Sequence, residues 1–338
     1  GLWQANDIMT GTQKQILGWA LPALMFLLLV NCDLRAIVAL GPRILLGFAC
    51  ATASILAAFT AVYALMRGFL PADGWQTLAS VSGGWIGGTA NMVSVSQAIG
   101  TSDNAMANAL LTDALCYSVW VLLLFASVPL QKHFNRFSKA VPMHQRLQTV
   151  APASTEKPSA SLDSGLVLLW LGLGLLAGKS SNTLAQWLPV SDGFSSTSWT
   201  LLLATLMGLI ASSTPLRRWS GSMNVSNALL AVVVAALASG ADFAGLGNAP
   251  VFLLCGFLVL AIHAALMALA ARLFRFDLAL CGIASLANIG GVASAPLLAA
   301  TYAPVLAPVG ILLAMLGYLI GTGGGLLLAR IFQSMGAA

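Results

Sequence analysis

The stretch Gly83-Gly84-Trp85-Ile86-Gly87-Gly88-Thr89-Ala90-Asn91-Met92-Val93-Ser94 decides how this chain can fold. Apolar residues flank it, glycines fill its centre, and small polar side chains end it. In water such a stretch would form a loop, but inside a membrane each backbone group without a hydrogen-bond partner costs several kcal/mol. A similar stretch occurs later, Asn288-Ile289-Gly290-Gly291-Val292-Ala293-Ser294-Ala295-Pro296. We predict that the two stretches face each other and form one functional site.

The composition places the chain in a membrane. Of its 338 residues, 59% are hydrophobic and 7% are charged, whereas soluble domains carry about 25% charged residues. The Lys and Arg residues lie between apolar runs, which is typical of the charge bias of membrane proteins and not of a nucleic-acid surface. No nucleotide-binding, haem-attachment or zinc-protease motif occurs, and the cysteines lack metal-ligand spacing. We therefore expect no cofactor and no enzyme activity.

Apolar segments alternate with polar turns along the chain. They cover residues 16–32, 44–66, 76–99, 105–129, 164–184, 198–214, 223–240, 250–271, 279–301 and 305–329. Most have the roughly 20 residues that a membrane-spanning helix needs. The polar stretch 131–163 predicts a flexible cytoplasmic linker. It divides an all-α polytopic membrane protein into a first repeat, 1–130, and a second repeat, 164–338.

The two halves share short sequence matches in the same order. Asp33 ends one apolar segment and is followed by Phe48 in the next, and Asp242 and Phe257 have the same separation. The two glycine-rich stretches follow in turn. This order predicts an internal duplication, which is typical of transporters. The second half has two more apolar segments before Asp242, so we expect the first half to lack about two N-terminal helices.

Two topologies fit the charge bias. If every segment crosses the membrane, the matched segments run in the same direction. If 76–99 and 279–301 are instead re-entrant hairpins, Arg35 and Arg43 join the linker on the inside, and the two repeats become inverted. The glycine pairs also split each segment into arms too short to span alone. We favour the hairpins, with helices that are broken but still cross as the alternative.

The chain resembles the domain of unknown function 819 (YjcL-like) family of membrane proteins over nearly its whole length. The resemblance rests on Asp33-Leu34-Arg35, Gly41-Pro42-Arg43, Ile86-Gly87-Gly88, Thr112-Asp113, Ala241-Asp242, Asn288-Ile289-Gly290-Gly291 and Gly317-Tyr318-x-x-Gly321-Thr322. That family is similar to inverted-repeat ion-coupled carriers: glutamate/sodium symporters, 2-hydroxycarboxylate carriers, bile-acid symporters and cation/proton antiporters. The resemblance implies a multi-pass protein of the bacterial inner membrane that forms a homodimer.

Asp113 is the leading candidate for a charged group in the site. It lies within the apolar segment 105–129, where a carboxylate is costly and indicates function. It could bind Na⁺, carry a proton, or hydrogen-bond a hairpin tip. Asp33 and Asp242 are interpreted first as helix-end or interface residues and second as ion ligands. His263 stands alone in its segment and could relay protons or simply pack.

The polar groups around the glycine pairs complete the predicted site. Unwound carbonyls and side-chain oxygens coordinate Na⁺, and exposed helix N-termini attract a carboxylate. The alternative is that these small residues only allow helices to pack closely. The predicted binding residues are Thr89, Asn91, Ser94, Ser96, Asp113, Asn288, Gly290, Gly291, Ser294 and Thr322. Those predicted to bind Na⁺ are Asn91, Asp113, Asn288 and Ser294.

The sequence therefore predicts a secondary transporter for a small anionic or zwitterionic organic solute, coupled to Na⁺ or H⁺. Alternating access would move a core that holds both hairpins against a scaffold of the remaining helices. The alternative is a cation/proton antiporter without an organic substrate, which would need two interacting carboxylates within the membrane. A channel or an intramembrane enzyme fits less well, because a channel has no need of paired broken segments. Expected partners are the lipid bilayer and a small-molecule substrate, not nucleic acid.

Overall fold

The structure is a computed structural model that describes residues 7–143, 164–190, 195–239 and 247–336. Within these residues the regular structure is helical, without strands. Six helical segments are long and apolar enough to cross a membrane: Gly11–Val30, Pro42–Phe69, Asp103–Ser138, Ser164–Ala185, Ala249–Phe274 and Pro304–Gly336. The predicted all-α polytopic membrane fold is confirmed. The duplication of the two halves stays a prediction.

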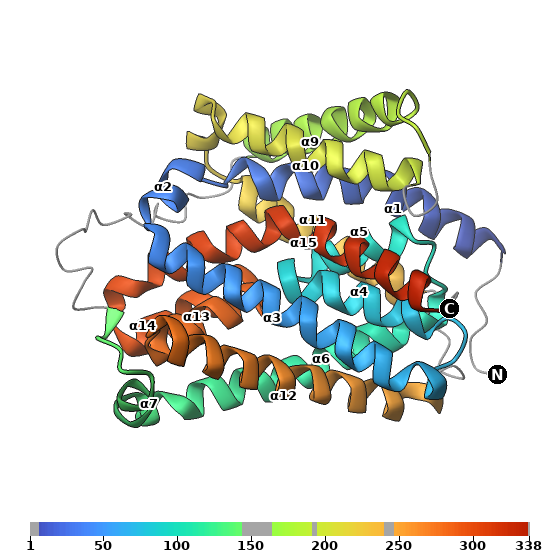
Figure 1. The fold of residues 1–338 in the computed structure, drawn as a ribbon. Coiled ribbons are helices and arrows are strands. Elements are labelled where there is room, and N and C mark those ends of the chain that lie inside the picture. Colours follow the sequence, from blue (N-terminus) through green and yellow to red (C-terminus); the bar gives the residue numbers. More distant parts are fainter. Residues whose placement is uncertain (1–6, 144–163, 191–194, 240–246, 337–338) are drawn as a thin grey trace.

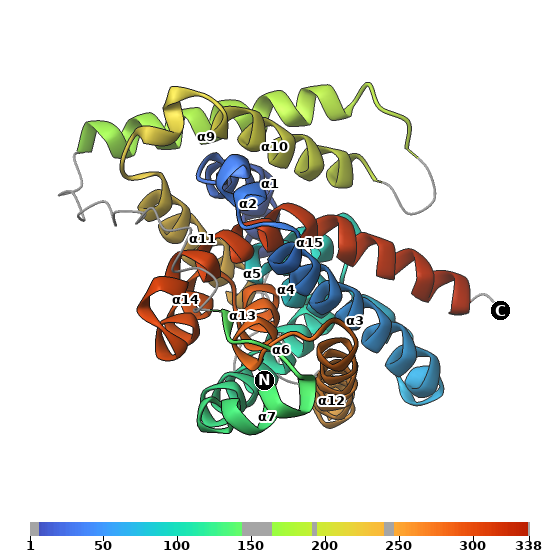
Figure 2. The same cartoon turned by 60° about the vertical axis from the view of Figure 1, so that its left-hand side comes forward.

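The helices form two bundles (Figures 1 and 2). The scaffold bundle consists of α1 (Asp7–Val30), α9 (Ser164–Ala185), α10 (Ser196–Ser212) and α11 (Ser222–Ser239), with α1 packed against the other three. Small residues permit this packing, as is common between helices in membranes. A Cβ atom on Gly208 of α10 would lie 2.5 Å from the carbonyl oxygen of Phe26 in α1.

The core bundle contains the glycine-rich stretches. Its helices are α3 (Pro42–Met66), α4 (Gly74–Gly87), α5 (Thr89–Ala98), α6 (Asp103–Ser127), α12 (Ala249–Phe274), α13 (Leu278–Ile289), α14 (Gly291–Tyr302) and α15 (Ala307–Gly336). The chain thus passes from scaffold to core twice. Figure 2 shows α1, α9 and α10 lying together on one side of the core helices.

Side-chain contacts define two ends of the molecule. At the first, which we call the linker end, Arg43 at the start of α3 donates to the carbonyl of Arg275 after α12. At the second, the Arg67 end, Arg67 after α3 donates to the carbonyl of Met335 near the end of α15. The helix directions place most of the described Arg and Lys residues at the linker end. Those at the Arg67 end are Lys14, Arg67, Lys179 and Arg330.

The predicted linker is partly structured. Residues Gln131–Ser138 form helix α7, and Asn135 on this helix accepts a hydrogen bond from the backbone N–H of Leu278, at 2.9 Å. The prediction of a flexible linker is therefore wrong for this segment, because its side chains hold it against the start of α13. Residues 144–163 lie outside the described residues.

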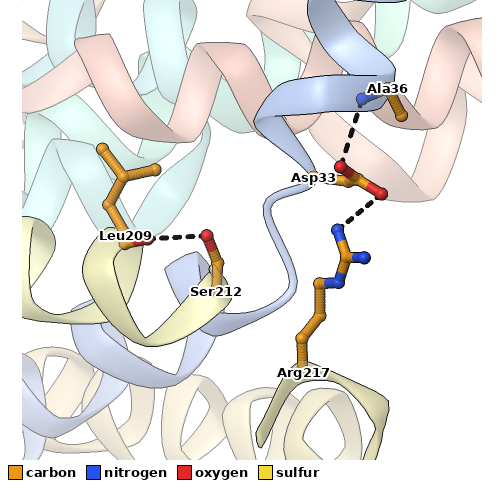
Figure 3. Close-up of polar contacts among 5 residues, drawn as sticks. All are labelled: Asp33, Ala36, Leu209, Ser212 and Arg217. Carbon is orange, nitrogen blue, oxygen red and sulfur yellow. Dashed lines mark hydrogen bonds and ion pairs between the residues drawn. The ribbon is translucent and has the colours of Figure 1, made fainter. Parts of the chain in front are cut away.

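Asp33 is a helix-end residue, as the first interpretation held. Its side chain accepts a hydrogen bond from the backbone N–H of Ala36 in the short helix α2 (Leu34–Ala39), at 3.1 Å, and pairs with Arg217 at 2.5 Å (Figure 3). Both side chains are about one-third exposed, so this ion pair contributes little to stability. Asp242, its counterpart in the second half, lies outside the described residues.

Candidate functional site

The first glycine-rich stretch folds into a helical hairpin, hairpin 1, made of α4 and α5. The Gln76 side chain near the start of α4 donates to the carbonyls of Ile99 and Gly100 just after α5, both at 3.3 Å. A helix running on in one direction would separate Gln76 and Gly100 by roughly 36 Å. The arms therefore lie antiparallel. Because α4 follows Arg67 along the chain, hairpin 1 opens at the Arg67 end.

The second stretch forms hairpin 2 from α13 and α14. A Cβ atom on Gly282 in α13 would lie 3.4 Å from Leu298 and 3.5 Å from the Tyr302 hydroxyl, both in α14. Asp277 caps α13 and also accepts from the backbone N–H of Met143, at 2.8 Å. Burial raises the pKa of Asp277, although these backbone N–H groups oppose the rise. This hairpin opens at the linker end, opposite to hairpin 1.

The tips of both hairpins meet on α15. A Cβ atom on Gly88, the turn of hairpin 1, would lie 3.0 Å from the Tyr318 ring, and one on Gly291, the turn of hairpin 2, would lie 3.2 Å from the Tyr318 hydroxyl. The neighbouring Gly317 sits under the carbonyls of Ile86 and Ala287, one from each hairpin. The N-termini of α5 and α14 therefore approach the same tyrosine. Both helix ends carry partial positive charge.

Asn91 and Asn288 fix the hairpins to neighbouring helices. The Thr322 hydroxyl of α15 donates to the Asn91 amide oxygen at 2.6 Å, and the Thr52 hydroxyl of α3 donates to the Asn288 amide oxygen at 2.9 Å. Each Asn also donates to a carbonyl of its own hairpin. The predicted site residues Asn91 and Thr322 are thus in contact. Thr52 is a partner that sequence reasoning missed, because nothing in the sequence gives the register between α3 and α13.

Asp113 lies on the face of α6 that covers the hairpins. The Trp85 indole of hairpin 1 donates to one carboxylate oxygen of Asp113 at 2.8 Å. One turn further along α6, Tyr117 lies against the tip of hairpin 2, 2.8 Å from where a Cβ on Gly290 would be. Asp113 is half-buried, and its second oxygen has no recorded partner among the described residues. Asp113 therefore contacts hairpin 1, and Tyr117 of the same helix lies against hairpin 2.

The remaining predicted residues divide into two groups. Ser294 lies beside Gly290 at the tip of hairpin 2, and its buried hydroxyl has no partner within the described chain. Thr89 is half-buried beside Gly88. Ser94 donates to a carbonyl of its own helix, whereas Ser96 lines a cavity towards the open end of hairpin 1. Ser96 is therefore not brought to the tips.

His263 belongs to a buried hydrogen-bond chain that sequence reasoning also missed. Its ring nitrogens lie 2.7 Å from the Ser54 hydroxyl of α3 and 2.8 Å from the Ser285 hydroxyl of α13. Trp120 of α6 donates to Ser285, and Ser54 donates to the Ala51 carbonyl. Every donor in this hydrogen-bond chain has an acceptor if the His263 imidazole is neutral with its proton on Nδ1. These contacts suit a residue that anchors hairpin 2.

Comparison with known proteins places the chain in a family. The family model described as a protein of unknown function, DUF819, matches residues 5–335. The chain belongs to this family. No curated protein and no solved structure was found to match it. The DUF819 match covers both hairpins, α6 and α15, so all the residues of the candidate site lie within the family region.

Proposed function

We propose that this DUF819 protein is a secondary transporter that couples movement of a small anionic or zwitterionic solute to Na⁺ or H⁺. The single observation that carries the proposal is the meeting of two glycine hairpins, open at opposite ends, on Gly317 and Tyr318. Discontinuous helices whose ends meet inside a bundle are the usual way in which transporters bind ions and solutes. A passive channel would gain nothing from two such hairpins.

The groups around the tips suit both solute and ion. The N-termini of α5 and α14 would attract a carboxylate. Na⁺ would be held by oxygen atoms, for which the candidates remain Asn91, Asp113, Asn288 and Ser294. The free Asp113 oxygen would supply the charge, and its protonation would serve the same purpose if H⁺ is the coupling ion. The Na⁺ sites, like the choice of ion, stay predictions.

The two-bundle architecture supports alternating access. The core bundle holds both hairpins, and the scaffold bundle contacts it mainly through α1 and α10. Movement of the core against the scaffold would expose the tips first to one side and then to the other. We also propose, on resemblance to related carriers, that the scaffold forms a homodimer and that the protein lies in a bacterial inner membrane.

Uptake into proteoliposomes tests the proposal. Radiolabelled small carboxylates and neutral amino acids would be offered one by one, with an inward Na⁺ gradient or an inward H⁺ gradient. We expect at least one solute to accumulate only with a gradient, and Asp113→Asn to abolish that accumulation. Ser118→Ala, on the exposed side of the same helix, is the matched control and should keep it.

Two outcomes would reject parts of this proposal. If Asp113→Asn accumulates solute like the wild type, Asp113 has no part in coupling. If no organic solute accumulates but a Na⁺ gradient moves protons, the protein is a cation/proton antiporter. Against that second function, Asp113 is the one acidic residue in the interior of the six candidate spans of the described chain.

A further inference from the structure

A polar cavity lies where the scaffold meets the core, at the Arg67 end. One part, of about 310 Å³, is bounded by α1, the end of α5 and the start of α6, and the adjoining part, of about 240 Å³, by α1, α5, α9 and α10. Lys14, Leu17 and Gln97 line both parts. Ligand sites of small molecules start at about 300 Å³, so the cavity suits a small solute.

One residue in the cavity lacks a partner that burial normally requires. The Ser96 side chain is fully buried and lines the larger part, yet its hydroxyl oxygen has no hydrogen-bond partner within the described residues. Buried polar groups are nearly always hydrogen-bonded, and an exception in a cavity indicates a missing ligand or water. Ser96 is also part of hairpin 1, so a ligand here would touch the core as well as the scaffold.

The charges in the lining are balanced. Lys14 supplies one ammonium group and Asp103 one carboxylate, and no other charged side chain lines either part. Gln13 donates to one Asp103 oxygen at 3.4 Å, and no ion pair joins Lys14 to Asp103 in the described part of the chain. Opposite charges that line one cavity without pairing are positioned for a ligand that carries both.

We propose that this cavity binds a zwitterionic solute of the amino-acid type. Lys14 pairs with the carboxylate. Asp103 pairs with the ammonium group, and Ser96 and Gln97 hydrogen-bond the remaining polar atoms. The inference concerns binding, so it does not rest on the proposed transport.

Calorimetric titration of the purified full chain tests the inference. The probes are the neutral L-amino acids, added individually, and for each one that binds, the matching carboxylic acid without the amino group and the matching amine without the carboxylate. We expect an amino acid to bind at least about tenfold more tightly than either analogue, because each loses a charge-assisted contact. No binding by any amino acid, or equal binding of the carboxylic acid, would overturn the inference.

Variants locate the binding site. Lys14→Gln and Asp103→Asn should each weaken binding by about tenfold. Lys179→Gln is the matched control, because Lys179 is an exposed lysine at the same end that lines neither part of the cavity. Binding that is lost in Asp113→Asn but kept in Lys14→Gln would place the solute at the tips and refute the cavity site. If Lys14→Gln does not fold, the binding of the amino acid and its two analogues to the wild type still tests whether the site recognises both charges.

Discussion

Replacing Gly317 by Ala would test whether α15 brings the two hairpin tips together. In the structure, a Cβ atom on Gly317 would lie 2.8 Å from the Ile86 carbonyl oxygen and 3.2 Å from the Ala287 carbonyl oxygen. Both are backbone atoms inside packed helices, so neither can move as a flexible side chain would. The added methyl group must therefore push the tips away from α15 or shift the helix.

The expected loss of unfolding free energy follows from comparison with a second glycine of α15, Gly323. Gly323 lies six residues further along α15, is exposed, and has no atom within 4 Å of a Cβ placed on it. Both Gly→Ala changes gain the same helix propensity, about 1 kcal/mol. Overpacking a well-packed site costs about 1–3 kcal/mol. The difference in unfolding free energy between Gly317→Ala and Gly323→Ala should therefore be about 1–3 kcal/mol.

Equilibrium unfolding in mixed detergent micelles, followed by tryptophan fluorescence, would measure this difference. Gly323→Ala should be at least as stable as the wild type, and Gly317→Ala less stable than Gly323→Ala. Uptake in the same two variants would show whether displaced tips also impair transport. Equal stability of the two variants would mean that α15 does not hold the tips in close contact, and the argument for a shared site would fail.

Other predictions concern the hairpins and their anchors. Thr322→Val keeps the shape of the side chain but leaves the buried Asn91 oxygen without its donor, which should lower the unfolding free energy by about 1–3 kcal/mol in the same assay. Thr60→Val is the control, because the Thr60 hydroxyl donates to a carbonyl of its own helix, and this change should alter the unfolding free energy less. In a cysteine-free background, Gly100→Cys and Ala303→Cys should react with a membrane-impermeant maleimide from opposite sides of oriented vesicles, because the hairpins open at opposite ends. Labelling of both from one side would contradict that topology.

The class of fold and the hairpins could be predicted from composition and local pattern. A charge-poor chain must be in a membrane, and glycine pairs that divide an apolar segment into short arms indicate a helix that turns back. The contact between the two stretches was predictable only as a pairing of similar sequences. The side chains that stabilise this contact could not be predicted, because helix periodicity does not determine which residues of different helices face each other. Thr52 and Trp85 illustrate this gap.

Ser96 lies further from the hairpin tip than its place in the sequence suggests. Ser96 follows Asn91 by five residues, and in a helix this is a rise of about 7.5 Å. That distance takes Ser96 away from the hairpin tip and into the cavity beside Lys14. Similarly, the polar residues of 131–138 read as linker, whereas Asn135 docks α7 on the core. In both cases the sequence contained the polar groups but not the tertiary contacts that they make.

In the glycine pair at each tip, the first and the second glycine have different roles, and the order of these roles is the same in both pairs. The second glycine of each pair, Gly88 or Gly291, has a positive φ, +81° and +63°, which an L-residue adopts at a cost of about 1–2 kcal/mol. The first fits a close approach: a Cβ on Gly87 would meet the Gly317 carbonyl oxygen at 2.5 Å, and one on Gly290 would meet the Tyr117 ring at 2.8 Å. A turn alone needs only the second glycine. The first is needed where the turn must also fit closely against a neighbouring helix, which is α15 for Gly87 and α6, through Tyr117, for Gly290.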